Sequence, residues 1–133
     1  MNVAQSGCYG ALNGLSSVFN SGYLNILSGT KPTNANATAT GTLLAQFQFG
    51  TTAFGSPFTS GSNGSITANL VSNTASVLVS GTAGYARGAN SSNGAVADFT
   101  VGTTGTDIIL TTTSLVSPGS ILITGFTITL PNG

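Results

Sequence analysis

From Tyr23 onward, apolar residues alternate with polar ones in short segments that are separated by glycine, asparagine, serine and proline. An alternation with a period of two is that of a β-strand, whose successive side chains point to opposite faces. The separating residues are typical of turns, and turns at intervals of about 8–12 residues indicate many short strands. The segments predicted to be strands are residues 23–27, 43–49, 65–70, 75–80, 82–87, 95–101, 107–112 and 121–130.

The two clearest segments also predict which side chains share a face. In residues 43–49 one face carries Leu43, Ala45, Phe47 and Phe49. The opposite face, which is expected to meet water or a partner, carries Leu44, Gln46 and Gln48. In residues 121–130 the shared apolar face is expected to carry Leu122, Phe126, Ile128 and Leu130, with Thr124 among them.

Before Tyr23 the spacing of apolar residues is that of a helix. One helical stripe is formed by Cys8, Ala11, Leu12, Leu15, Val18 and Phe19. Gly10 and Gly14 each weaken an isolated helix by about 1 kcal/mol relative to alanine, so this helix needs packing to hold it. Gly22 is expected to end it. We therefore predict a helical segment at residues 1–22 and a single β domain at residues 23–133.

These patterns predict an all-β fold, an antiparallel β-sandwich or jelly roll with a short N-terminal helix. The chain is 40% hydrophobic, which favours a folded core over disorder. Loops are expected at residues 28–41, 50–64 and 88–94, and Asn93-Gly94 is a signal for a tight hairpin turn.

Only four side chains are charged, Lys31, Arg87, Asp98 and Asp107, and the formal net charge is zero. An average globular domain carries charge on about a quarter of its residues. Neither self-repulsion nor a charged surface would keep copies of this chain apart, so we expect neighbouring subunits to cover much of it. No basic block favours nucleic acid, and no apolar run approaches the roughly 18 residues of a membrane span. We therefore expect neither nucleic acid nor membrane as a partner.

The residue types needed for catalysis are nearly missing. There is no histidine, and Cys8 is the single cysteine, which removes the commonest general base, the catalytic triads and a zinc tetrahedron. Asp98 and Asp107 could form a glycosidase-like pair, or Asp107 could bind calcium with the preceding threonines, but both sites need further acidic or tuned groups. An ion pair of Asp98 with Arg87 across a hairpin is the simpler role, worth about 0–1 kcal/mol if exposed. We expect no enzyme activity, no cofactor and no metal.

The aromatic residues allow two interpretations. Tyr9, Tyr23, Tyr85 and the seven phenylalanines could stack on sugars or bases. Filling of the core is favoured, because stacking sites are usually flanked by polar or charged groups that read the ligand.

Several segments together resemble a known family. In the first half they are Gly-Tyr-Leu-Asn-Ile-Leu-Ser-Gly-Thr-Lys-Pro at residues 22–32 and Ala-Thr-Gly-Thr-Leu-Leu-Ala at residues 39–45. In the second half they are residues 81–87, 96–98, 101–103, 107–110 and 123–131. Over nearly the whole chain this is similar to a family of small proteins encoded by tailed bacteriophages and prophages. Members open with a helix, then a strand ending in Gly-Thr-x-Pro, an Ala/Asn-rich loop and a Thr-Gly-x-Leu-Leu strand.

The resemblance implies a non-enzymatic protein of the virion. We expect a cement or decoration protein on the phage head that binds the major capsid protein lattice and copies of itself, for example as a trimer. The alternatives are a tail tube, adaptor or fibre-tip subunit and, from another class, a carbohydrate-binding β-sandwich. The candidate partner-binding residues lie on the helical stripe and are Leu12, Leu15, Val18 and Phe19, and the other role open to this stripe is that of a cap on the β domain.

Overall fold

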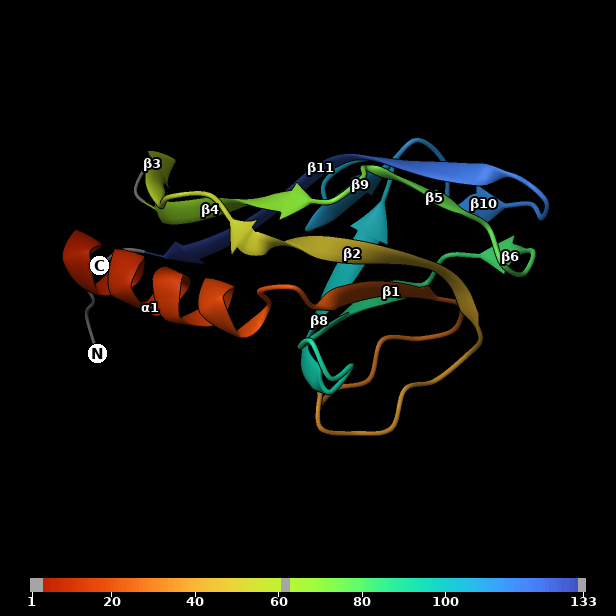
Figure 1. Ribbon diagram of the computed structural model, residues 1–133, viewed down its shortest axis with the longest axis horizontal. Helices are drawn as coiled ribbons and strands as arrows, with labels where there is room; N and C mark the ends of the chain where they lie inside the picture. The colour runs from red at the N-terminus through yellow and green to blue at the C-terminus, as the bar shows by residue number, and fades with distance from the viewer. Residues whose placement is uncertain (1–3, 61–62, 132–133) are drawn as a thin grey trace.

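The computed structural model describes residues 4–60 and 63–131, in which one helix and eleven strands confirm the predicted all-β fold (Figure 1). Helix α1 spans Gln5–Val18. The strands are β1 (Tyr23–Leu27), β2 (Leu43–Phe54), β3 (Phe58–Ser60), β4 (Asn63–Leu70), β5 (Thr74–Ser76), β6 (Gly81–Thr82), β7 (Tyr85–Ala89), β8 (Ala95–Gly102), β9 (Ile108–Leu110), β10 (Ser114–Leu115) and β11 (Ser120–Pro131).

Seven of these strands close into a barrel, in the order β4-β2-β1-β7-β8-β9-β11, with β11 pairing back onto β4. The predicted sandwich or jelly roll is therefore wrong. Alternation shows that each strand has a buried face, but closure depends on β11 pairing with β9 on one side and with β4 and β5 on the other. The pairs around the barrel are antiparallel except β8 and β9, which are parallel. Closure leaves few strand edges free.

The predicted strand boundaries hold best at the start of the chain. Strand β1 occupies the predicted residues 23–27. The predicted loop at 50–64 is wrong in its described part, since β2 continues to Phe54 and β3 and β4 follow; residues 61–62 lie outside the described residues. The chain just after the helix supports this extension, because Asn20 Oδ1 accepts a hydrogen bond from Ala53 N at 2.8 Å. The short pair β6 and β10 was not predicted as such.

The predicted facing of two residues is wrong: Leu44 was expected to face outward and Leu122 to face inward. Leu44 is buried, although it alternates with inward residues, because the β5–β6 connection covers it: Leu78 N donates to the Leu44 carbonyl at 2.7 Å. Leu122 is exposed, although it was expected on the apolar face. A β-bulge between Ile123 and Gly125 reverses the alternation, so that Ile123 and Phe126 both face inward.

The core joins the helix to the barrel. Five phenylalanine rings pack with centroid separations of 5.0–6.1 Å, and they are Phe19, Phe49, Phe54, Phe99 and Phe126. Helix α1 lies alongside β4 and β11 at the end of the molecule where both chain termini lie (Figure 1). Cys8 and Leu12 of the helix are buried against Gly64 of β4, where a Cβ would lie 3.2–3.3 Å from them. The helix and the barrel therefore share one hydrophobic core.

Candidate functional site

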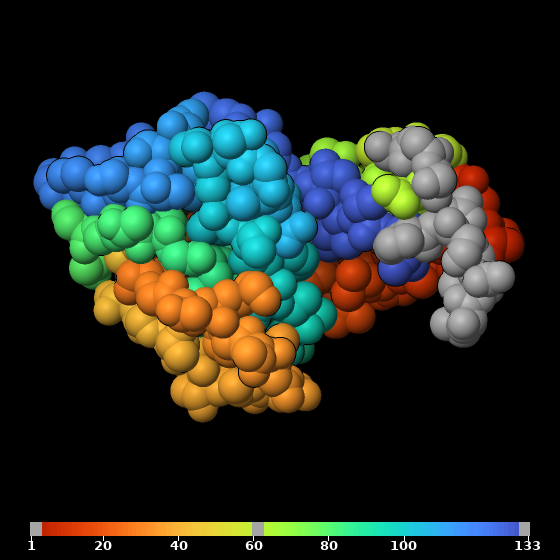
Figure 2. Space-filling view, turned by 180° about the vertical axis from the view of Figure 1, so that it is seen from behind, coloured from red at the N-terminus to blue at the C-terminus, as the bar shows by residue number. Residues whose placement is uncertain are grey.

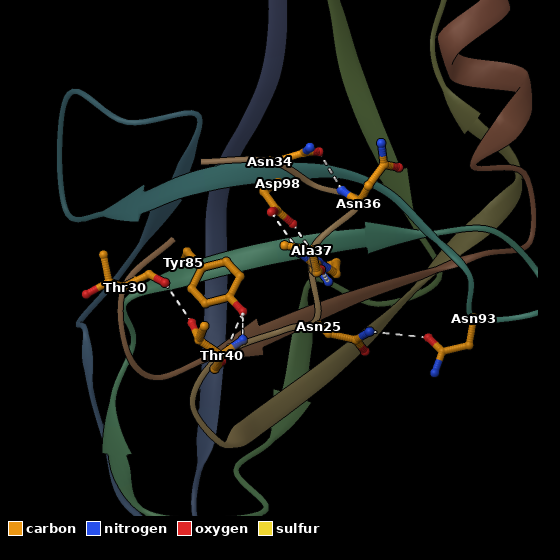
Figure 3. Close-up of polar contacts among 10 residues, drawn as sticks. Asn25, Thr30, Asn34, Asn36, Ala37, Thr40, Tyr85, Asn93 and Asp98 are labelled. Atoms are coloured by element: carbon orange, nitrogen blue, oxygen red, sulfur yellow. Dashed lines mark hydrogen bonds and ion pairs between the residues drawn. The ribbon is translucent and has the colours of Figure 1, made fainter. Parts of the chain in front are cut away.

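The connection between β1 and β2, residues 28–42, folds over the outside of the barrel (Figure 3). A connection of this length without secondary structure is uncommon in a compact domain and is usually functional or disordered. Tyr85 and Arg87 of β7 hold this loop in place. Both point outward, because Ala86 between them faces the core and successive side chains of a strand alternate.

The Arg87 guanidinium connects two strands and the loop. It lies opposite Asp98 of β8 and donates from Nε to Oδ1 at 2.7 Å and from Nη2 to Oδ2 at 3.0 Å. Its Nη1 donates to the carbonyl oxygen of Ala37 in the loop at 2.8 Å. The ion pair suggested by the sequence is confirmed, but it is buried rather than exposed, with 9% and 4% of the two side chains accessible.

This environment keeps Arg87 charged. The hydrogen bond to Asp98 raises the pKa of Arg87 above its ordinary, strongly basic value, and this outweighs the opposing effect of burial. A raised pKa in the folded state means that the contribution to stability is complete below the ordinary arginine pKa. It is lost only as the pH rises through the folded-state pKa, so the pair is intact at neutral pH.

Tyr85 makes the second anchor of the loop. Its ring is fully buried, and its hydroxyl donates to the Thr40 carbonyl at 3.0 Å and accepts from Thr40 N at 2.9 Å. The two bonds satisfy the polar end of a buried aromatic residue. Tyr85 therefore has a structural role and is not available as a stacking surface.

Beside the anchored loop, three side-chain amides form a row that we call the amide ladder: Gln46, Asn25 and Asn93. Gln46 Nε2 donates to Asn25 Oδ1 at 2.8 Å, and Asn25 Nδ2 donates to Asn93 Oδ1 at 3.2 Å. Gln46 and Asn25 are neighbours across β2 and β1. Asn93 belongs to the β7–β8 turn, and Figure 3 shows its side chain facing Asn25. The turn predicted from Asn93-Gly94 is confirmed, with Asn93 at a φ of 61°.

A half-exposed aromatic ring stands next to the ladder. Tyr23 lies two residues before Asn25 on β1, so the two side chains share the outer face. Its cross-strand neighbours are Gln48 on β2, which is exposed, and Ala89 on β7. The charged residues beside this face, Arg87 and Asp98, neutralise each other, so the surface presents amides and one phenol ring without net charge.

The two carboxylates are both used by the fold. Asp98 is bound to Arg87, and Asp107 Oδ2 accepts from the backbone N and the Oγ1 of Thr100, at 3.2 Å each. Among the described residues, no group of three or more His, Cys, Asp or Glu side chains lies close enough together to hold a metal ion. Cys8 is buried.

The helical stripe mostly faces the protein's own core. Leu12 and Phe19 are buried, and Leu15 is partly buried against the same core. Leu12 and Phe19 fill the interior in this structure, and the assignment of the stripe to a partner-binding surface stays a prediction. Val18 differs, since 47% of it is exposed. This burial favours the alternative role of the stripe, which is to cap the β domain.

At the end of the molecule opposite the helix, three large apolar side chains are exposed, and we call them the apolar tip: Leu78, Val79 and Val116. They belong to the β5–β6 and β10–β11 connections, beside the strands labelled at the far right of Figure 1. The two connections are joined by a hydrogen bond from Ser117 N to Ser80 Oγ of 2.9 Å. Exposed apolar side chains gathered in one place are typical of an interaction surface.

A polar groove of about 340 Å³ lies at the C-terminal half of the helix. Its lining includes Asn13, Ser17 and Asn20 of the helical region and Thr52 of β2. The one aromatic residue in its wall, Phe54, is buried in the core, so no ring face is offered there. The space-filling view shows the covering loop, residues 28–42, as a projection on the opposite side of the molecule's long axis from β11 (Figure 2).

Sequence reasoning did not identify the amide ladder or the apolar tip. Gln46 was expected on a face that meets water or a partner. Its partners in the ladder depend on strand pairing and on Asn93, which lies 68 residues after Asn25 in the sequence. Val79 and Val116 were not singled out, because they look like core residues until the barrel leaves them outside.

The prediction that the aromatic side chains fill the core is confirmed for most of the rings. Of the phenylalanines, Phe58 on β3 is exposed, and the others are buried. Core filling therefore accounts for Tyr85 and for six phenylalanines, whereas Tyr9 and Tyr23 are only partly buried.

Within residues 4–60 and 63–131, no helix has the length and apolar character needed to cross a lipid bilayer. Comparison with known proteins gives no match, since no family model, curated protein or solved structure is significantly similar to this chain.

Proposed function

We propose that this protein is a non-enzymatic structural component of a phage virion, a cement or decoration protein that binds the major capsid protein lattice on the head surface. The apolar tip carries the proposal. It gathers exposed leucine and valine side chains in two hydrogen-bonded connections, on a chain with four charges. Such a surface docks without removing charged groups from water, which is the costly part of burying polar surface.

The family resemblance of the sequence supports the same function. The placement of both carboxylates supports a role without catalysis, because Asp98 and Asp107 are engaged by Arg87 and Thr100. A protein that binds only the assembled lattice stabilises that lattice by mass action. Many copies, each with a modest contact and neighbours of the same kind, would hold the lattice strongly.

Copy number in purified particles tests the proposal. Quantitative mass spectrometry of virions should find this chain in numbers comparable to the major capsid protein. A few copies per particle would instead indicate the tail tube, adaptor or fibre-tip alternative. Absence from washed particles would contradict a virion role altogether.

Two matched valine variants test the surface. Val79, in the apolar tip, is 45% exposed, and Val18, on the helix at the other end, is 47% exposed. We expect Val79→Asp to weaken attachment to particles that lack the protein by at least about tenfold, because binding would then bury an unpaired carboxylate. Val18→Asp should attach normally.

The opposite pattern, with attachment lost in Val18→Asp and kept in Val79→Asp, would move the partner surface to the helix. Circular dichroism of both variants shows that neither result comes from unfolding. Attachment unchanged in both variants would contradict docking through either end.

A further inference from the structure

The outer face of β1 and β2 holds a group of neutral hydrogen-bonding side chains that the proposed docking through the apolar tip leaves free. The amide ladder fixes Asn25 between two partners, so both ends of its amide are used. Within the described residues, Gln46 Oε1 and Asn93 Nδ2 have no hydrogen-bond partner. The ladder therefore leaves the Gln46 side-chain oxygen and the Asn93 side-chain nitrogen free, on side chains whose position is already set.

We propose that this face, formed by Tyr23, Gln48 and the amide ladder, is a binding site for neutral carbohydrate. An amide offers a donor and an acceptor side by side, which matches the adjacent hydroxyl groups of a sugar ring. Because the ladder is ordered by internal hydrogen bonds, binding loses less side-chain entropy than it would with freely rotating amides.

Tyr23 supplies the apolar part of the site. A sugar ring has a face of C–H groups that packs on the accessible part of an aromatic ring. Tyr23 is half-exposed and lies between Gln48 and the small side chain of Ala89. The ring thus stands beside the amides, on the same face of the same two strands.

The charges favour a neutral ligand. Arg87 and Asp98 next to the ladder are buried and paired, and Arg87 Nη1 donates to the Ala37 carbonyl. No unpaired charge on β1 or β2 is available to hold a sulfate, phosphate or carboxylate, since both strands consist of uncharged residues.

Two other places in the molecule fit a sugar less well. The groove beside Asn13 and Thr52 has hydroxyls and amides but no exposed ring. The apolar tip has no amide side chains in its defining residues. The face of β1 and β2 combines a half-buried aromatic ring with free amide atoms on two uncharged strands.

Nuclear magnetic resonance tests the proposal directly, because the ¹⁵N–¹H spectrum includes the side-chain NH₂ groups of asparagine and glutamine. The 13.1 kDa chain is titrated with maltohexaose, cellohexaose, chitohexaose and a mannose hexasaccharide. With at least one of them, we expect saturable shifts of the Gln46 and Asn93 side-chain signals. The dissociation constant should be on the order of 1 mM, since an open surface buries little of the ligand.

Variants then assign the contact. Gln46→Ala combined with Gln48→Ala, and separately Tyr23→Leu, should weaken binding at least about tenfold, whereas Tyr23→Phe keeps the ring and should bind within about twofold. Asn13→Ala in the groove and Asn69→Ala, an exposed amide on β4, are controls that should bind normally. The dispersion of the backbone signals verifies the fold of each variant.

Three outcomes would overturn the inference: no saturable shift with any of the four sugars, shifts confined to Asn13 and Thr52, or full binding by the Gln46 and Tyr23→Leu variants. The test is separate from that of the proposed function. The double glutamine variant should still attach to particles, and Val79→Asp should still bind sugar.

Discussion

At the residue scale, the Arg87–Asp98 pair shows most clearly that the contribution of an ion pair to stability depends on what covers it. On an exposed hairpin this pair would contribute about 0–1 kcal/mol. Here the loop closes over it and adds a bond from Arg87 to the Ala37 carbonyl. Removing one member of a buried pair leaves the other charged, desolvated and unsatisfied.

We therefore expect Asp98→Asn to lower the free energy of unfolding by about 3–5 kcal/mol. Urea denaturation followed by circular dichroism measures this change. Asp107→Asn is the matched control, because Asp107 is exposed and bonded to Thr100, and it should cost about 1 kcal/mol. Equal effects of the two substitutions would contradict the special role of the buried pair.

Gly88 shows the same dependence on tertiary contact. It lies on β7, and a Cβ there would approach Phe19 Cε1 to 2.5 Å and Phe99 Cε2 to 3.0 Å. We expect Gly88→Ala to destabilise the protein by about 1–3 kcal/mol through overpacking. Gly14→Ala on the helix has open space around it and should stabilise by up to about 1 kcal/mol. Thermal denaturation of the two variants should show shifts of opposite sign.

At the element scale, helix α1 closes the core. Its glycines make it a poor helix by itself, and its buried residues give it a place in the fold. Phe19, just after its last turn, contacts Phe49, Phe54 and Phe99. The helix is thus held by the barrel, and the barrel's aromatic cluster is completed by the helix.

Deleting residues 1–19 should consequently destabilise the β domain instead of leaving it intact. Loss of Phe19 alone is expected to cost about 3–5 kcal/mol, as is typical for a buried phenylalanine reduced to alanine. Differential scanning calorimetry of Phe19→Ala and of the truncated chain measures the effect. A truncated chain with the melting temperature of the full chain would show that the helix is dispensable.

At the scale of the whole molecule, the lack of charge predicts how the protein associates. The barrel exposes hydroxyls, amides and the apolar tip, while two of the four charged side chains are buried as the Arg87–Asp98 ion pair. Salt screens interactions between charges and leaves apolar contacts largely unchanged or stronger.

Attachment to virus particles should then change less than about threefold between 50 and 200 mM salt, whereas binding through several ion pairs falls by orders of magnitude over that range. Sedimentation of particles with labelled protein at several salt concentrations measures this. A steep loss with salt would show that charges of the partner dominate the contact, contrary to the proposed docking through the tip.

The sequence alone determined the all-β class, the helix near the N-terminus and strand β1, because these follow from local periodicity. It suggested the Arg87–Asp98 pair, which the register of β7 and β8 then decided. Barrel closure, the burial of Leu44 and the reversed facing of Leu122 were decided by tertiary structure. They depend on the pairing of β11 with β4, on a connection that covers β2 and on the bulge between Ile123 and Gly125. The amide ladder and the apolar tip were also decided by tertiary structure. Local alternation predicts which side chains share one face of a strand, but the folded chain decides which residues those side chains contact.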